Sequence, residues 1–305
     1  MQLIIKNLNK TYANGVQALT NVSLTINKGM FGLLGPNGAG KSSLMRTIAT
    51  LQEADSGTIS FQSSQAEINV LEEKDKVRSI LGYLPQEFGV YPKVSAEVLL
   101  DHLAVLKGIT NRKERKEVVA ALLNKTNLYD KRKKNLGGFS GGMKQRFGIA
   151  QALLANPELI IVDEPTAGLD PAERNRFHNL LSELGENTIV ILSTHIVDDV
   201  KELCTDMAII NKGEVLLQVH PLRAIERLEN KIWRKRIERS EVESYGKRMN
   251  VISDRMSAGK PVIHVFSESQ PEEGFEIVEA DLEDVYFQEI SSSTKSELSF
   301  NKVEN

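Results

Sequence analysis

The segment GPNGAGKS, Gly35–Ser42, constrains the fold of this chain more than any other part of the sequence. It satisfies the pattern G-x-x-x-x-G-K-S/T and follows a short apolar run at Met30–Leu34, as expected of a buried strand that enters a loop. Apolar residues at helical spacing come next, at Leu44, Ile48 and Leu51. A strand, a glycine-rich loop and a helix in this order are the context that a phosphate-binding loop requires. A glycine-rich turn with a chance lysine is the alternative, and the flanking elements disfavour it.

The residue types in this loop suit the polyphosphate of a nucleotide. The glycines allow the backbone to curl so that successive N–H groups point at the phosphates, and the following helix adds the positive end of its dipole. Lys41, a predicted catalytic residue, is expected to place its ammonium on the β- and γ-phosphates, and Ser42 to offer its hydroxyl to Mg²⁺. The predicted cofactor-binding residues of this segment are Gly35, Pro36, Asn37, Gly38, Ala39, Gly40, Lys41, Ser42 and Ser43.

A pair of carboxylates follows a second apolar run, Leu159–Val162. A buried strand that ends in Asp163 and Glu164 places both at the C-terminal edge of a sheet, where ligands collect in open α/β folds. We expect Asp163 to hold Mg²⁺, directly or through water, and Glu164 to polarise the attacking water as the general base. An acidic turn ended by Pro165 is the alternative, which the phosphate loop elsewhere in the chain weakens.

Strand and helix signals alternate along much of the chain. The strand signals lie at Gln2–Leu8, Val22–Ile26, Met30–Leu34, Leu159–Val162, Thr188–Leu192 and Met207–Ile210. Helical patterns lie between the later ones, at Ala172–Leu184 and Ile196–Leu203. This alternation predicts an α/β core with a parallel sheet over residues 1–220, into which a helical subdomain at about residues 88–156 is inserted.

The character of the sequence changes after about Pro221. A charged helix leads to apolar segments at Ile232–Ile237 and Val262–Phe266, which predict a small α+β accessory domain over residues 221–290. The polar residues 291–305 are expected to form a disordered tail.

Composition excludes several classes of protein. The formal net charge of −3 gives no basic character that would indicate a nucleic-acid partner. The single cysteine, Cys204, rules out an internal disulfide framework and is expected to be a small core residue. The apolar runs are far shorter than the ~20 residues that span a bilayer, and the start lacks the apolar run of a signal peptide. We therefore expect a soluble, cytoplasmic chain, so any membrane-spanning part belongs to another chain.

The segment FSGGMKQR, Phe139–Arg146, resembles the signature of the nucleotide-binding subunits of ABC transporters, usually written LSGGQ. The resemblance spans roughly Met1–Val219 and recurs at several motifs in order. Phe139 replaces the usual leucine, which is also apolar, and Met143 takes the place of the glutamine, as is common in family members that end in MKQR. The resemblance implies a P-loop NTPase ABC ATPase core with an inserted helical subdomain, followed here by the small C-terminal α+β accessory domain.

The resemblance also implies roles for residues around the nucleotide. Tyr12 matches the aromatic residue that stacks on adenine. Gln86, in YLPQ, matches the glutamine that contacts Mg²⁺ and senses the transmembrane partner. His195, in LSTH, matches the switch histidine that contacts the γ-phosphate. By itself a histidine is more often structural, but the strand signal that precedes His195 predicts the sheet edge that also carries Asp163. The remaining histidines, His102, His178, His220 and His264, show no ligand spacing.

A second group of matched residues implies a dimer. Ser140, Gly141 and Gly142 match the signature that binds the γ-phosphate of ATP held by the opposite subunit, and Ala167–Asp170 matches the loop that communicates across the dimer. A serine and two glycines at a helix start make physical sense as a second anion site. A serine N-cap before a glycine-weakened helix is the alternative.

The resemblance implies an ATP-binding and ATP-hydrolysing subunit that powers a membrane transporter. The expected partners are a transmembrane permease and a second nucleotide-binding subunit, with no nucleic acid, and the expected place is peripheral on the inner face of the cell membrane. The segment Ala280–Ile290 resembles the tail of bacterial export-type members, which favours export. Two alternatives remain: a soluble ABC-type ATPase acting on ribosomes or DNA, and an unrelated P-loop kinase. One phosphate loop and no sustained heptad run count against the first, and the signature counts against the second.

Overall fold

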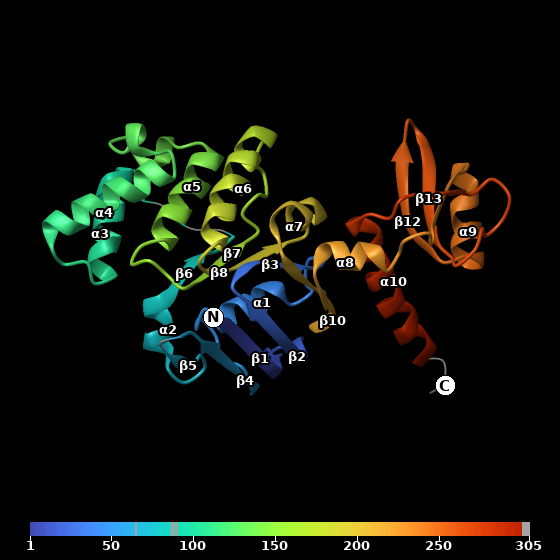
Figure 1. The fold of residues 1–305 in the computed structure, drawn as a ribbon, viewed down its shortest axis with the longest axis horizontal. Helices are drawn as coiled ribbons and strands as arrows, with labels where there is room; N and C mark the ends of the chain where they lie inside the picture. Colours follow the sequence, from blue (N-terminus) through green and yellow to red (C-terminus); the bar gives the residue numbers. More distant parts are fainter. Residues whose placement is uncertain (65, 87–88, 90, 301–305) are drawn as a thin grey trace. The chain divides into compact units, whose positions relative to one another are not determined.

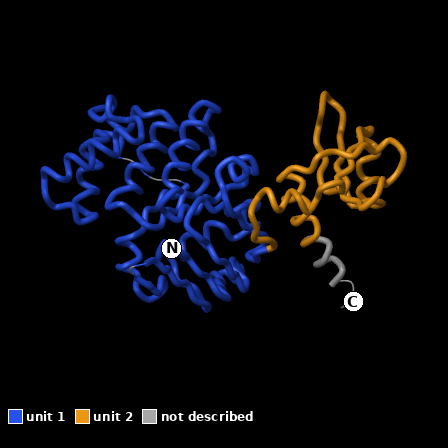
Figure 2. Tube along the Cα trace, viewed as in Figure 1, with its two compact units in different colours: residues 1–215 blue, residues 216–305 orange. Residues whose placement is uncertain are grey.

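The structure is a computed structural model, and it describes residues 1–64, 66–86, 89 and 91–300. The chain divides into two compact units, Met1–Val215 and Leu216–Asn305, which are coloured separately in Figure 2. Among the described residues, no helix combines the length and the apolar character that crossing a bilayer requires.

The centre of the first unit is a sheet in the order β10-β9-β3-β8-β7-β6 (Figure 1). Its strands are β3 (Gly29–Leu34), β6 (Leu81–Leu84), β7 (Leu159–Asp163), β8 (Ile189–Thr194), β9 (Asp206–Asn211) and β10 (Glu214–Val219), and β10 begins in the first unit and ends in the second. β3 runs parallel to β8 and β9, and β7 runs parallel to β8 and β6. Because β7 and β8 are buried at every position, they read as continuous apolar runs rather than as alternating ones. Their carboxyl ends therefore meet at one edge of the sheet, where the polar residues begin.

A second, antiparallel sheet has the order β2-β1-β4-β5. Its strands are β1 (Gln2–Thr11), β2 (Gln17–Asn27), β4 (Ser56–Gln62) and β5 (Glu67–Asn69). Alternate residues of β1 and β2, such as Leu3, Ile5 and Leu24, point into one hydrophobic core that also contains Phe31 and Ile161 of the parallel sheet. The two sheets are thus joined by a shared apolar interior.

The helices of the first unit are α1 (Lys41–Ile48), α2 (Lys74–Ile80), α3 (Ala96–Leu106), α4 (Arg112–Lys125), α5 (Gly141–Ala152), α6 (Pro171–Gly185) and α7 (Val197–Leu203), with short 3₁₀ turns η1 (Tyr129–Lys131) and η2 (Leu136–Gly138). α3, α4 and α5 enclose a separate apolar cluster that includes Leu100, Leu123 and Phe147. Side chains of Ser95 and Asn111 cap α3 and α4. The helical block therefore has a core of its own, as an inserted subdomain requires.

The second unit contains α8 (Pro221–Glu226), β11 (Ile232–Arg236), η3 (Arg239–Glu241), α9 (Val242–Arg248), β12 (Val251–Ser257), β13 (Lys260–Phe266), β14 (Glu276–Ile277) and α10 (Leu282–Phe300). Its sheet has the order β12-β13-β11-β14. Tyr245 of α9 packs against Ile263, Val265 and Phe275 to form the core of this unit. The predicted α/β core, helical subdomain and small α+β accessory domain are confirmed as a fold class.

One expectation for the C-terminus is wrong in part. Residues 291–305 were expected to form a disordered tail, yet α10 continues to Phe300, and residues 301–305 lie outside the described residues. The helix is started by reciprocal bonds, because Asp281 accepts from Asp284 N–H at 2.8 Å and Asp284 accepts from Asp281 N–H at 3.1 Å. Buried Leu282 and Val285 then anchor its first turn, and a polar sequence continues a helix that is already nucleated. The other predicted domain limits stay predictions.

Candidate nucleotide-binding site

The phosphate loop lies between β3 and α1, as predicted. Gly40 is the N-cap residue of α1 and has φ 105°, in the region that favours glycine. A Cβ at Gly40 would lie 2.5 Å from the carbonyl oxygen of Ala18, and one at Gly35 would lie 2.3 Å from that of Ile210. These two glycines are therefore required by the close approach of neighbouring backbone as well as by the curl of the loop.

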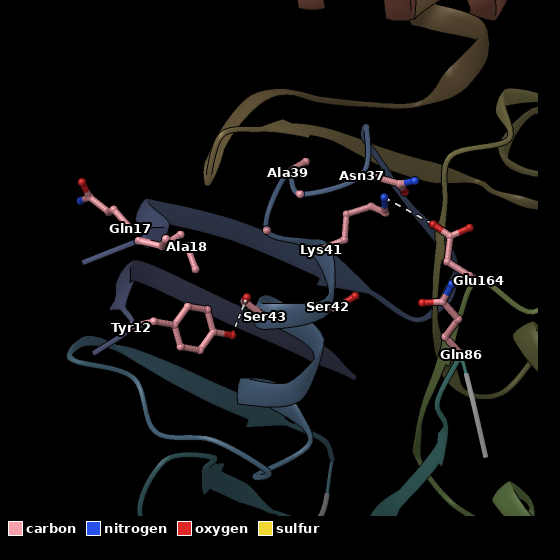
Figure 3. A pocket seen from close by; sticks show the side chains of 13 residues that line it. Tyr12, Gln17, Ala18, Asn37, Ala39, Lys41, Ser42, Ser43, Gln86 and Glu164 are labelled. Atoms are coloured by element: carbon pink, nitrogen blue, oxygen red, sulfur yellow. Dashed lines mark hydrogen bonds and ion pairs between the residues drawn. The ribbon is translucent and has the colours of Figure 1, made fainter. Parts of the chain in front are cut away.

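Lys41 is 5% exposed and lies across the loop. Its Nζ donates to the carbonyl oxygens of Gly35 at 2.7 Å and Pro36 at 3.2 Å, and it lies 3.3 Å from Glu164 Oε1. Figure 3 shows this last contact as a dashed line. Phosphate oxygens are stronger partners for an ammonium than carbonyl oxygens are. The Lys41 side chain thus sits where an anion above the loop would meet it.

Glu164 joins the loop to the edge of the sheet. It follows β7, is 6% exposed and has φ 50°, which is strained for a residue with a side chain. Its N–H donates to Ser193 O at 3.0 Å, which fixes the turn. While one carboxylate oxygen faces Lys41, the other lies 2.6 Å from Nδ1 of His195, which follows β8. Lys41, Glu164 and His195 therefore form one connected row.

Asp163, the last residue of β7, is also buried and accepts a hydrogen bond from Ser193 Oγ. It does not line the pocket beside the phosphate loop, whereas Ser42, Gln86 and Glu164 do. The part of the chain that the structure describes holds no group of three or more His, Cys, Asp or Glu residues suited to a metal. Hydroxyl, amide and carboxylate oxygens are nonetheless the donors that Mg²⁺ prefers when phosphates complete its shell, so the predicted set fits in its chemistry.

The pocket itself has a volume of about 510 Å³, within the range of small-molecule sites. In Figure 3, Lys41 and Glu164 lie at one end and Tyr12 at the other. Tyr12 is 36% exposed, and its hydroxyl bonds Ser43 Oγ at 2.9 Å and Gln52 Oε1 at 3.1 Å. The lining also includes three residues that the sequence did not single out: Val16, Gln17 and Ala18. They carry no motif, and the only signal that could have shown their return beside Tyr12 is the dipeptide Asn14-Gly15, which is typical of a turn.

The signature residues lie away from this pocket. Ser140 is the N-cap residue of α5, is exposed, and accepts from Met143 N–H at 3.2 Å. Gly141 is exposed too, whereas Gly142 is buried, and a Cβ there would lie 2.4 Å from Glu173 Oε2. Neither Ser140 nor Gly141 lines the pocket of the same chain. The exposed helix start is thus free to meet a ligand held elsewhere.

A phosphate loop between a parallel strand and a helix, with a carboxylate and a histidine at the same sheet edge, defines a P-loop nucleotide-binding protein. The family model described as "ABC transporter" matches residues 19–167. "Uncharacterized ABC transporter ATP-binding protein YxlF" of Bacillus subtilis (strain 168) is 37% identical over 214 residues, covering 70% of this chain and 69% of that protein. The chain belongs to the family of ABC transporter ATP-binding proteins.

Two further similarities bear on function. "Methionine import ATP-binding protein MetN" of Histophilus somni (strain 129Pt) is 34% identical over 224 residues, covering 70% of this chain and 64% of that protein. The solved "Dimeric structure of a post-hydrolysis state of the ATP-binding cassette MJ0796 bound to ADP and Pi" has a TM-score of 0.63 and 27% identity, covering 72% of this chain and 98% of that chain. The chain is an ATP-binding ATPase subunit of the ABC transporter family.

Proposed function

We propose that this ATPase drives export through a separate transmembrane permease, at the inner face of the cell membrane, by ATP-dependent pairing of two nucleotide-binding subunits. The connected row Lys41, Glu164 and His195 beside the phosphate loop is the observation that carries the catalytic part of this proposal. Relatives include an import protein, so the direction rests on the likeness of Ala280–Ile290 to the tail of export-type members.

Lys41, Glu164 and His195 have different roles in the proposed hydrolysis. Lys41 supplies the counter-charge for the β- and γ-phosphates and stabilises the charge that develops on them. Glu164, freed from Lys41 by the incoming phosphates, accepts the proton of the attacking water. His195 lies 2.6 Å from the second carboxylate oxygen of Glu164 and so orients the carboxylate. The His195 side chain is 48% exposed, so its ring is also accessible to the γ-phosphate.

Ser42, Gln86 and Asp163 are the residues that would hold Mg²⁺, which when bound neutralises charge on the phosphate oxygens. Ser42 and Gln86 line the pocket itself, and Asp163 stands beside Glu164 at the strand end. Tyr12 lines the opposite end of the pocket, and in this proposal its ring stacks on the adenine base.

The signature completes the site from a second subunit. Ser140 and Gly141 are exposed at a helix start that does not reach the pocket of their own chain. An N-cap hydroxyl with bare N–H groups and a helix dipole attracts an anion, which in this proposal is the γ-phosphate of ATP on the partner subunit. ATP then holds two copies together, and hydrolysis releases them.

Ser140→Arg tests this arrangement. ATP binding is expected to survive, because Ser140 lies outside its own pocket, while hydrolysis is lost because the bulky cation blocks the site across the dimer. Binding of a fluorescent nucleotide measures ATP binding, and phosphate release measures hydrolysis. Mixing Ser140→Arg with Lys41→Ala chains is expected to restore hydrolysis, since mixed dimers contain one site with an intact loop and an intact signature. A mixture that stays inactive, or lost binding by Ser140→Arg alone, would contradict a role in the partner's site.

An apolar groove supports the permease as partner. It has a volume of about 400 Å³ and lies between the sheet core and the helical block, where Leu51, Leu103 and Leu106 contribute to its lining. Leu51 is 61% and Leu106 71% exposed, although both are large and apolar. Burial lowers the pKa of Lys107, which also lines the groove and whose ammonium donates to Leu81 O at 2.9 Å. A mostly apolar groove of this size suits a short helix supplied by a membrane protein.

The double substitution Leu51→Glu/Leu106→Glu is expected to release the full chain from its host's membranes, because two charges would be buried against the docked helix. Val98→Glu is the matched control, because Val98 is an exposed residue of α3 outside the groove. Membrane flotation measures the association, and a thermal melt checks the fold. Binding that both variants retain would rule out this groove, and co-sedimentation of the wild-type chain with ribosomes would favour the soluble alternative.

A further inference from the structure

Asp199 of α7 is a fully buried carboxylate, at 0% exposure. A carboxylate in a protein interior is costly unless donors surround it. Its Oδ1 accepts from Arg174 Nε at 2.8 Å and lies 2.9 Å from His178 Nε2, both on α6. Its Oδ2 accepts from the hydroxyls of Thr166 at 2.6 Å and Thr194 at 3.3 Å. The two oxygens therefore serve different parts of the fold.

The Oδ1 side fixes the carboxylate in place. Arg174 contributes a second nitrogen, Nη2, at 2.7 Å from the same oxygen. His178 is 5% exposed, and its Nδ1 lies 2.8 Å from Glu202 Oε2, so the ring is held at both nitrogens. These contacts alone would hold α6 against α7, so the hydroxyls of Thr166 and Thr194 are not needed for that attachment.

The Oδ2 side reaches the two segments that carry the proposed catalytic residues. Thr166 lies on the turn that begins with Glu164, and Thr194 immediately precedes His195. Thr194 Oγ1 also accepts from Ile196 N–H at 2.9 Å, which closes the turn around the histidine. The Asp199 Oδ2 atom thus links, through these two hydroxyls, the turn that carries Glu164 to the turn that carries His195.

We propose that Asp199 is a positioning residue for ATP hydrolysis, acting through Thr166 and Thr194 to set the separation of Glu164 and His195. The proposal rests on the proposed roles of Glu164 and His195. Because those two side chains meet at 2.6 Å, a shift of either turn breaks their contact and moves the carboxylate away from the water it must deprotonate. Misplacement by about 1 Å can cost on the order of 100-fold in rate.

Thr166→Val tests the bridge without disturbing the contacts to Arg174 and His178. It removes one hydroxyl from a residue that is 3% exposed and keeps the side-chain shape. We expect kcat to fall by about 10-fold or more, with the Kd for ATP within about 2-fold of the wild-type value. Thr126→Val is the matched control, because Thr126 is 1% exposed and its hydroxyl bonds Leu122 O at 2.9 Å within the helical block. An equal kcat in both variants would overturn the proposal.

A double-mutant cycle separates positioning from general loosening of the fold. In a His195→Ala background, Thr166→Val is expected to lower kcat much less than in the wild type, since the contact it protects is already gone. Where His195→Ala itself lowers kcat, a fully additive loss would overturn the proposal. If His195→Ala alone leaves kcat intact, the proposed role of the histidine fails, whereas a low kcat of Thr166→Val still supports positioning of Glu164. Asp199→Asn, which retains the size of the side chain, is expected to lower kcat as Thr166→Val does, without weakening ATP binding.

Discussion

Lys41→Ala is expected to abolish ATP hydrolysis, with kcat lowered by at least about 100-fold. The ammonium donates to the loop carbonyls of Gly35 and Pro36, so its loss removes the counter-charge that we expect it to supply to the phosphates. Removing the ammonium also leaves the buried carboxylate of Glu164 beside the phosphates of ATP with no cation between them, which disfavours ATP binding. Phosphate release and fluorescent-nucleotide binding measure the two effects.

Lys28→Ala provides the control, since it removes the same charge from an exposed position before β3. Its turnover should equal that of the wild type. Turnover by Lys41→Ala at the rate of this control would show that the phosphate loop is not the hydrolytic site.

Glu164→Gln should retain ATP but stall hydrolysis, trapping a dimer. The amide fills the space of the carboxylate and cannot accept the proton of water, a loss worth about 10²–10⁴-fold in rate. Nucleotide binding should survive or tighten, because a negative charge beside the polyphosphate is removed. Gel filtration with ATP and Mg²⁺ reports the dimer.

The matched variant is Glu183→Gln, an exposed carboxylate on α6. It should hydrolyse ATP normally and leave the elution volume unchanged. A Glu164→Gln chain that binds ATP and yet elutes as a monomer would refute the pairing of two subunits over the nucleotide.

Much of the fold could be predicted because its central strands are continuous apolar runs. Met30–Leu34 and Leu159–Val162 appear as β3 and β7 with only small changes at their ends. Cys204 is buried, as expected of a small core residue. β4 and β6 were not predicted, since Ser56–Gln62 alternates weakly and Leu81–Leu84 is too short to distinguish from a helix end.

Less of the geometry of the site than of the fold could be predicted from the sequence. Spacing placed Lys41 on a loop and Glu164 at a strand end, but it could not give the left-handed φ of Glu164 or its contact with His195. His178 received no role because its partners come from α7, and only the packing of α6 on α7 joins them. The predicted roles of the site residues stay predictions until the variants above are measured.

The separate apolar interior of α3, α4 and α5 has a mechanical consequence. Leu106, at one end of α3, faces the groove, and Ser140 starts α5. Because buried Leu100 and Phe147 belong to one closely packed cluster, we expect a force applied at the groove to move the three helices together. If the proposed permease docks in this groove, we expect pressure on Leu106 to shift Ser140, the N-cap residue of α5, without any contact to the nucleotide.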